Sequence, residues 1–280
     1  MHEGKMSIVD AVVAHVFQIE ISLYHACARL DGRTDAEALH DLRINVRRLR
    51  SLLNPLRGRD GVEALDEAAA AVGQLTTPVR DLEVLADELR KRGLSGPAST
   101  REAMLASHYV EILQSTELRE LFARLDAWPE VARAAEREGE LRKLDKLLRK
   151  RLRKQMVRLQ EALTNMQHDP HRIRLLVKRN RYAADAYPQH SPISPEAVSV
   201  LKAVQSSLGA WHDRYQWSLR ACQESDLEPL RQQWQSEAVK ALEEAESRLL
   251  VLAGLFISAN KSKTNGPAHE HSYWQNWSIV

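Results

Sequence analysis

The sequence predicts an all-α fold. Aromatic residues make up 5% of the 280 residues, and the chain has only 11 Gly and 10 Pro. Sheet proteins usually carry more aromatic and β-branched residues and more turn residues. Apolar residues recur at helical spacing, beginning with Ile8, Val12, Val16, Ile19 and Leu23. The length suffices for one large domain or two small ones.

The predicted helices follow one another with short connections. Thr34 and Glu37 match a capping box, and Pro78, Pro129 and Pro170 each suit the first turn of a helix. We expect helices over residues 7–30, 34–56, 62–75, 79–92, 100–114, 117–126, 129–166, 170–187, 196–208, 212–224 and 228–257. Residues 258–280 lack helical periodicity, and we expect them to form a flexible tail.

Two features bear on the cellular compartment. The only cysteines, Cys27 and Cys222, lie far apart in the sequence, which argues against a disulfide framework and favours a reducing environment. The N-terminal region lacks the pattern of a signal peptide, and no stretch reaches 18 uninterrupted apolar residues. We therefore expect a cytoplasmic protein that does not span a membrane.

Positive charge is concentrated in three windows, although the net charge is only +2. Residues 40–59, 142–158 and 171–181 hold 20 of the 40 Lys and Arg residues, and their only acids are Asp41 and Asp145. The rest of the chain is acidic. Such segregation can build a strong local positive potential.

Two of the windows contain the same motif. His40, Arg43, Arg47, Arg48 and Arg50 are matched, at a constant offset of 131 residues, by His171, Arg174, Lys178, Arg179 and Arg181. A later apolar stretch with a turn and an Asp also recurs, at Asp81 and Asp213. The repeat predicts a duplication: one helical domain over residues 1–257, with a first half at about 1–128 and a second half at about 129–257, related by a pseudo-twofold axis.

A helical wheel arranges most of these cations in two stripes. His40, Arg43, Arg47 and Arg50 fall within an arc of roughly 80°, as do their counterparts His171, Arg174, Lys178 and Arg181, and each stripe borders the apolar face of its helix. Arg48 and Arg179 are expected to point away. Like charges stacked at i, i+4 and i+7 repel one another unless an anion neutralises them. We expect the stripes to line a groove between helices.

A third stripe is predicted on the helix over residues 129–166. Arg142, Lys146, Arg149 and Arg153 lie along one border of its apolar face. Long bundle helices are often basic, so a solvated surface explains this stripe almost as well as a ligand does.

The residue types favour a polyanionic ligand. A guanidinium presents a planar, permanently charged fork to phosphate or carboxylate oxygens, and successive helical turns repeat it every 5.4 Å. Three alternatives remain. The stripes could pair with acids elsewhere in the chain, the ligand could be a nucleic acid, or the protein could be an enzyme that acts on phosphoanhydrides. Metal ligation by His40 or His171 is disfavoured because neither has a His, Cys or carboxylate residue four positions later. Asp81 and Asp213 are expected to act structurally, as helix caps or as partners that orient an Arg, and no cofactor is expected.

The double H-x-x-R-x-x-x-[RK]-R-x-R motif, with the Asp-containing run after each copy, resembles the CHAD domain, a conserved-histidine α-helical domain. The resemblance covers about residues 5–257 and implies two four-helix bundles around a basic central groove. It further implies binding of inorganic polyphosphate without catalysis, and association with polyphosphate granules as in some members. The stripe residues would face the ligand. Asn180 stands where family members usually have Leu.

Overall fold

The computed structural model describes residues 7–59, 61–139, 141–164 and 169–261. All secondary structure in these ranges is helical, which confirms the predicted all-α class. The α-helices are α1 (Ile8–Asp31), α2 (Ala38–Leu53), α3 (Val62–Lys91), α4 (Ser95–Gln114), α5 (Thr116–Arg137), α6 (Leu144–Thr164), α7 (Pro170–Ala186), α8 (Pro195–Arg220) and α9 (Arg231–Lys261). Short 3-10 helices, η1 (Asn54–Leu56) and η2 (Ser225–Leu230), follow α2 and precede α9.

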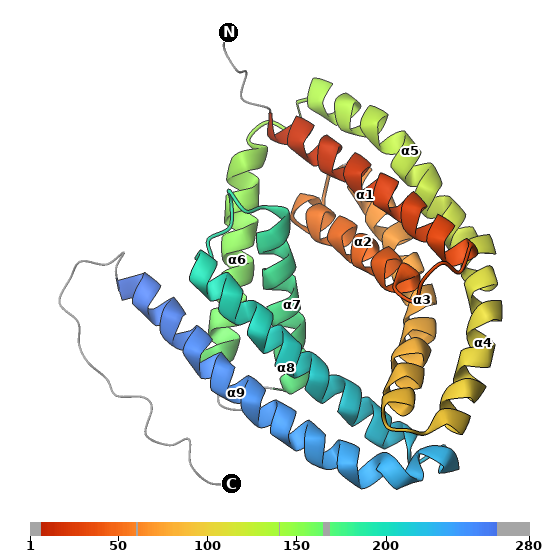
Figure 1. Ribbon diagram of the computed structural model, residues 1–280. Helices are drawn as coiled ribbons and strands as arrows, with labels where there is room; N and C mark the ends of the chain where they lie inside the picture. Colours follow the sequence, from red (N-terminus) through yellow and green to blue (C-terminus); the bar gives the residue numbers. More distant parts are fainter. Residues whose placement is uncertain (1–6, 60, 140, 165–168, 262–280) are drawn as a thin grey trace.

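The helices pack as two groups, α1–α5 and α6–α9. α5 is one continuous helix that crosses residue 128, the expected end of the first half. Figure 1 shows the two groups arranged as a ring, with α2, α3, α7 and α8 on its inner side. The twofold relation between the halves stays a prediction.

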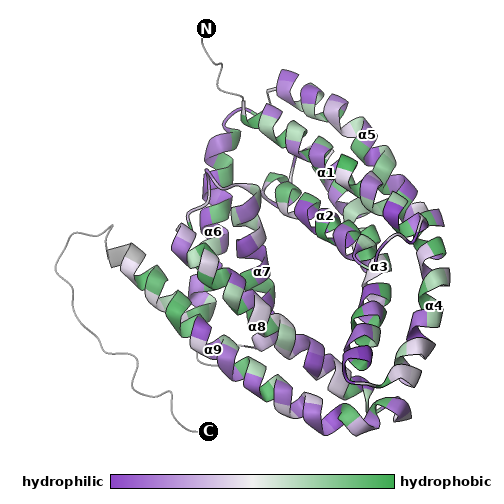
Figure 2. Ribbon diagram, in the orientation of Figure 1, coloured by the Kyte–Doolittle hydropathy of each residue, from purple (hydrophilic) through white to green (hydrophobic). Residues whose placement is uncertain are grey.

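Amphipathic helices produce this arrangement. Along each helix, hydrophobic and hydrophilic residues alternate, as Figure 2 shows. On α2 the predicted apolar arc is buried in the core of the first group, with Leu39, Leu42 and Leu49 fully shielded from solvent. The cationic arc of the same helix lies beside the apolar arc, so burying one places the other along the edge of the core.

The two groups of helices meet at two joints, which close the ring. At one joint, Leu148 and Leu152 of α6 and Tyr187 after α7 belong to the core of the first group. At the other, the ends of α3 and α4 pack on α8, η2 and α9 around the buried Trp234. Ion pairs cross this second joint: Arg92 with Glu237 at 2.7 Å and Arg101 with Asp226 at 2.7 Å. The inner helices α2, α3, α7 and α8 are held between the two joints.

Several predicted helix boundaries are wrong. Pro78 and Pro129 do not open helices; they lie inside α3 and α5. Pro78 and Gln74 are both exposed, so the carbonyl that loses its helical donor at Pro78 faces solvent, which lowers the cost of the interruption. The predicted break near Gly209 is also absent, and α8 is continuous.

The predicted helix over 129–166 is two helices. α5 ends where Gly139 takes a left-handed conformation, with φ of +80°, and α6 begins at Leu144 after Lys143, also left-handed. Glycine adopts this conformation at little cost, which explains the helix end. Arg142 therefore lies in the turn before α6 rather than on a helix.

The capping box at Thr34 does not form. α2 begins four residues later, at Ala38, without a side-chain cap. The Thr34 hydroxyl donates instead to the carbonyl of Arg29, and the Asp35 carboxylate pairs with the Arg29 guanidinium. At the other end of the chain, α9 continues to Lys261, beyond the predicted end at 257, and the rest of the predicted tail lies outside the described residues.

Among the described helices, only α1 has the length and mean hydropathy of a possible membrane span. One face of α1, which includes Val16 and Leu23, is buried in the core against α2 and α5. Phe17, Ile21 and Tyr24 of the same helix are exposed.

Candidate anion-binding site

Two inner helices, α2 and α7, bring the duplicated motifs together. The Arg47 guanidinium donates a 2.6 Å hydrogen bond to the Tyr182 hydroxyl, and the Tyr187 hydroxyl donates to the carbonyl of Leu52. Both contacts join residues 135 apart in the sequence, so the two helices run side by side in the same direction. The first stripe thus lies next to the second.

A groove of about 570 Å³ lies between α2, α3, α6 and α7. We call it the basic groove; the cations that line it are Arg43, Arg47, Arg50, Arg57, Arg158, Lys178 and Arg179. No Asp or Glu is among its described lining residues. Of the eight residues in the two predicted stripes, Arg43, Arg47, Arg50 and Lys178 are among its lining residues.

Arg43 is held in position by α3. Its Nη1 donates to the carbonyl of Gly73 at 3.1 Å and to the hydroxyls of Thr76 and Thr77 at 2.8 and 3.0 Å. Burial, and secondarily the nearby charge of Arg47, lowers the pKa of Arg43. The neutral acceptors on α3 orient the guanidinium without neutralising it.

Arg50 and Arg57 are partly neutralised. Both guanidiniums contact the Asp66 carboxylate, Arg50 at 3.3 Å and Arg57 at 2.5 Å. Asp66 is buried, so it stabilises the two cations at one end of the groove. This end offers an anion less uncompensated charge than the end that holds Arg43 and Arg47.

Lys178 and Arg174 are crowded cations on α7. Burial, together with the nearby charges of Arg174 and Arg47, lowers the pKa of Lys178 to about 7. Burial likewise lowers the pKa of Arg174, whose Nε has no hydrogen-bond partner among the described residues. Crowding cations at half-buried positions is unfavourable, and an incoming anion would relieve it.

Asp81 on α3 and Asp213 on α8 face these cations. Burial raises the pKa of Asp213, while the charges of Arg174 and Lys178 oppose that rise. Asp81 is solvent-accessible, yet surrounding protein displaces enough water to raise its pKa as well. Both lie well inside their helices, so the predicted capping role is wrong. Neither makes an ion pair with a described residue, and their influence on the Arg174 and Lys178 cations is electrostatic.

The two motif histidines have different surroundings. Burial, followed by the charge of Arg80, lowers the pKa of His40. His171 lies against the rings of Trp211, His212 and Tyr215, at centroid distances of 4.6, 5.5 and 5.7 Å. His40 and His171 lie at the N-terminal ends of the two stripes and do not line the basic groove.

The third predicted stripe lies outside the basic groove. Lys146, Arg149 and Arg153 are exposed on α6, Arg142 precedes the helix, and Arg149 pairs with Asp145 at 2.9 Å. Another part of α6 reaches the groove and η1: Arg158 lines the groove, and Arg151 donates to the carbonyl of Pro55 in η1 at 3.0 Å. The packing of α6 on its neighbours decides which of its cations line the groove, and a single-helix wheel does not contain that packing.

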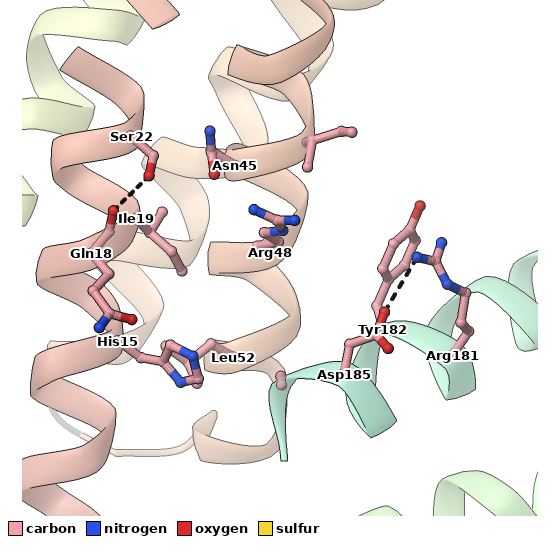
Figure 3. A pocket seen from close by; sticks show the side chains of 12 residues that line it. His15, Gln18, Ile19, Ser22, Asn45, Arg48, Leu52, Arg181, Tyr182 and Asp185 are labelled. Atoms are coloured by element: carbon pink, nitrogen blue, oxygen red, sulfur yellow. Dashed lines mark hydrogen bonds and ion pairs between the residues drawn. The ribbon is translucent and has the colours of Figure 1, made fainter. Parts of the chain in front are cut away.

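The wheel also misplaced two cations of α7. Arg179, expected to point away, lines the basic groove, whereas Arg181 lines a second pocket with Arg48, between α1, α2 and α7. Figure 3 shows Arg48 and Arg181 facing this second pocket from opposite sides. Tyr182 lines both spaces and separates them.

Sequence reasoning missed Arg57, Arg158 and Tyr182. The two arginines lie inside the basic windows, so charge counting was a usable signal for them. Tyr182 follows the second motif directly, but nothing in the spacing indicates that its hydroxyl accepts from Arg47. Such a contact depends on how α2 packs against α7.

The buried Asn180 also joins elements of the site. Its Nδ2 donates to the carbonyl of Leu176 at 2.9 Å and to that of Gln155 on α6 at 3.4 Å. The polar residue at a core position is thus satisfied, and it connects α7 to α6 beside the groove.

The fold and the site define an all-helical protein with a duplicated basic motif on two adjacent inner helices. The chain belongs to the CHAD domain family, whose profile matches residues 18–222. It is similar to the crystal structure of the CHAD domain from the plant Ricinus communis, with a TM-score of 0.59 and 23% identity over 91% of this chain and 92% of that one. A similarity to PptA from Streptomyces chartreusis has a TM-score of 0.46 and 19% identity over 90% of this chain and 99% of that one. No curated protein matches the chain.

Proposed function

We propose that this CHAD protein binds inorganic polyphosphate in the basic groove and does not process it. The observation that carries the proposal is the lining of the groove: seven Arg and Lys side chains from both motif helices, α6 and the segment after η1, with no acid among the described lining residues. A protein surface without a ligand normally mixes the two signs of charge, because like charges repel.

The geometry of the cations suits a repeating anion. Arg43, Arg47 and Arg50 recur at about one-turn intervals on α2, which corresponds to a rise of roughly 5 Å per turn. Their guanidiniums are held by α3 and by Tyr182, so little side-chain freedom is lost on binding. Lys178, across the groove, adds a cation without an acidic partner among the described residues.

The absence of catalysis is part of the proposal. Phosphoryl transfer usually needs carboxylates that hold a metal beside the cationic clamp. Among the described residues no group of three or more His, Cys, Asp or Glu side chains has a geometry suited to a metal ion. From the two distant cysteines and the N-terminal sequence pattern, we further propose a cytoplasmic location. By family resemblance, we propose association with polyphosphate granules.

A nucleic-acid ligand is the main alternative. Non-specific binding of single strands combines cations with aromatic rings on which bases stack. Tyr182 is the aromatic residue that lines the groove, and its ring already lies 5.2 Å from the Arg47 guanidinium and 4.6 Å from that of Arg181. This arrangement favours polyphosphate, whose repeating unit offers oxygens and no rings.

The test is a titration of the protein with fluorescently labelled long-chain polyphosphate at two salt concentrations. We expect saturable binding that weakens steeply with salt, because bound cations release the counterions of the polyanion. Unlabelled polyphosphate should displace the label at a lower phosphate concentration than single-stranded RNA or DNA. Displacement by RNA at equal phosphate concentration would favour the nucleic-acid alternative.

A further inference from the structure

Lys178 is the one lysine among the described residues that line the basic groove; the other cations there are arginines. Its amine makes no hydrogen bond or ion pair with a described residue, whereas Arg43 is held by α3 and Arg47 by Tyr182. The side chain is half-buried at the groove wall. A small molecule that enters the groove therefore meets a lysine amine that no neighbouring acceptor holds in place.

The charged and titratable groups that face Lys178 come from four helices. They are Arg43 and Arg47 of α2, Asp81 of α3, Arg174 of α7, and His212 and Asp213 of α8. Burial and the three guanidiniums destabilise the ammonium form more than the two carboxylates stabilise it, which lowers the pKa of Lys178 to about 7. Near neutral pH, roughly half of the molecules therefore carry a neutral amine, the nucleophilic form of lysine.

The surroundings of the amine match one class of electrophile. Arg43 and Arg47 attract phosphate oxygens. Leu175, one helical turn before Lys178, also lines the groove and is 50% exposed, so it offers an apolar contact beside the cations. An acyl phosphate, the mixed anhydride of a carboxylic acid and phosphoric acid, carries a phosphate and an apolar acyl group, and its carbonyl carbon reacts with amines.

We propose that Lys178 is a modification site, acylated on Nζ by small acyl phosphates whose phosphate binds to Arg43 and Arg47. The neutral amine attacks the carbonyl carbon with its lone pair and forms the C–N bond. The bond from that carbon to the bridging oxygen breaks, inorganic phosphate leaves with the electron pair, and the nitrogen releases one proton to water. The reaction consumes no oxidant or reductant.

The product amide is uncharged, so the groove loses one of its cations. Acylation should therefore weaken binding of the polyanion, a consequence that rests on the proposed function. The reactivity of Lys178 itself does not depend on that function, because it needs only the amine, the arginines around it and a small acyl phosphate.

The experiment incubates the full chain with acetyl phosphate at pH 7.5 and follows each lysine by peptide mass spectrometry. We expect Lys178 to be acetylated at least about tenfold faster than Lys146 and Lys150, which are exposed on α6 outside the groove. The rate at Lys178 should level off above pH about 7, the pKa of its amine. The rate at an ordinary exposed lysine rises until about pH 10.

A matched pair of variants tests the role of the neighbouring charge. Arg174→Gln should slow acetylation of Lys178 about threefold or more, because removing a nearby cation raises the pKa of the amine. The control Arg153→Gln, on α6 outside the groove, should leave the rate within about twofold. Unchanged unfolding temperatures verify that both variants fold. Equal rates in the two variants would contradict the proposed activation of Lys178.

Polyphosphate in excess should protect Lys178 and leave Lys146 unaffected. Rapid acetylation of Lys178 that polyphosphate does not slow would support the reactive lysine and contradict the proposed function, so the two failures are distinguishable. With acetic anhydride, which carries no phosphate, the preference for Lys178 should shrink at least about threefold, because the reagent is no longer held by the arginines. Acetylation by acetyl phosphate that is no faster at Lys178 than at Lys146 would overturn the inference.

Discussion

The Arg47 guanidinium on α2 donates a 2.6 Å hydrogen bond to the Tyr182 hydroxyl on α7 and lies 5.2 Å from the centre of the Tyr182 ring. The contact joins the two copies of the repeated motif. It also fixes the Arg47 side chain at the wall of the basic groove, where a flexible arginine would otherwise lose rotamer entropy on binding an anion. Tyr182 therefore acts as a positioning residue for Arg47.

Replacing Tyr182 with Phe tests this role. The variant keeps the ring and loses the hydroxyl that accepts from Arg47. We expect the affinity for polyphosphate to fall about three- to tenfold, which corresponds to a loss of about 1 kcal/mol, typical of one hydrogen bond. In the Arg47→Gln background the same change should have little further effect. Additive losses in that double-mutant cycle would contradict the positioning role.

Binding should weaken as pH rises through about 7. The pKa of Lys178 is lowered to about 7, so the free protein loses this cation above that pH. The anion favours the charged form, and binding at pH 8 therefore requires uptake of a proton. Titrations between pH 6 and 8.5 should show this loss, and Lys178→Met should remove the part of the slope that Lys178 causes. An identical slope in the variant would contradict the assignment.

The same lowered pKa predicts the opposite trend for folding stability. The unfolded chain holds the Lys178 proton up to its ordinary pKa of 10.5, whereas the folded protein releases it near 7. Between these values the unfolded state binds more protons, so this group makes the folded protein more stable as pH rises. Urea unfolding of wild type and Lys178→Met at pH 6.5 and 9 measures the difference. A larger gain with pH in the variant than in wild type would contradict it.

Asp213 lies close to Arg174 and Lys178, whose charges would also attract the proposed polyanion. Its charge favours the charged forms of Arg174 and Lys178. We expect Asp213→Asn to bind polyphosphate about three- to tenfold more tightly, because removing a nearby negative charge strengthens attraction of an anion. An enzyme would behave differently: magnesium-dependent release of phosphate from polyphosphate that Asp213→Asn or Asp81→Asn abolishes would contradict a non-catalytic role.

The apolar joint of the ring contributes strongly to stability. Leu148 on α6 is fully buried in the core of the first group. Leu148→Ala should lower the free energy of unfolding by about 2–5 kcal/mol, the range for buried leucines. The matched control is Leu219→Ala on α8, where the leucine is 47% exposed and a change of less than about 1 kcal/mol is expected. If chemical denaturation showed equal losses of unfolding free energy for the two variants, the apolar joint would not be a major source of stability.

The all-α fold class and the duplication of the motif were predicted from the sequence, because both are visible in local patterns. Helical spacing and a repeat at one offset need no knowledge of how helices pack. Helix ends were harder to predict. Pro78 and Pro129 looked like helix starts, and each is tolerated inside a helix.

The composition of the groove depended on packing that no single-helix pattern contains. Arg43 and Arg47 line the groove because they share the edge of the apolar face of α2. For Arg179 and Arg181 the expected positions are the reverse of the observed ones: Arg179 lines the groove and Arg181 lines the second pocket. The contacts of α7 with α2 and α6 decide which face of α7 meets the groove. The Asp66 carboxylate that pairs with Arg50 belongs to α3, and nothing in the motif indicates that contact.

The most direct test of the central claim compares two variants that each lose three basic residues. One replaces Arg43, Arg47 and Lys178 of the basic groove with Gln; the other replaces Lys146, Arg149 and Arg153, which are exposed on α6 outside it. The measurement is the affinity for long-chain polyphosphate at one fixed salt concentration. We predict a loss of more than about a hundredfold for the groove variant and less than about fivefold for the α6 variant, because only the groove variant loses direct charge-assisted contacts. Equal losses in the two variants would contradict the account, since binding would then follow net charge rather than the groove.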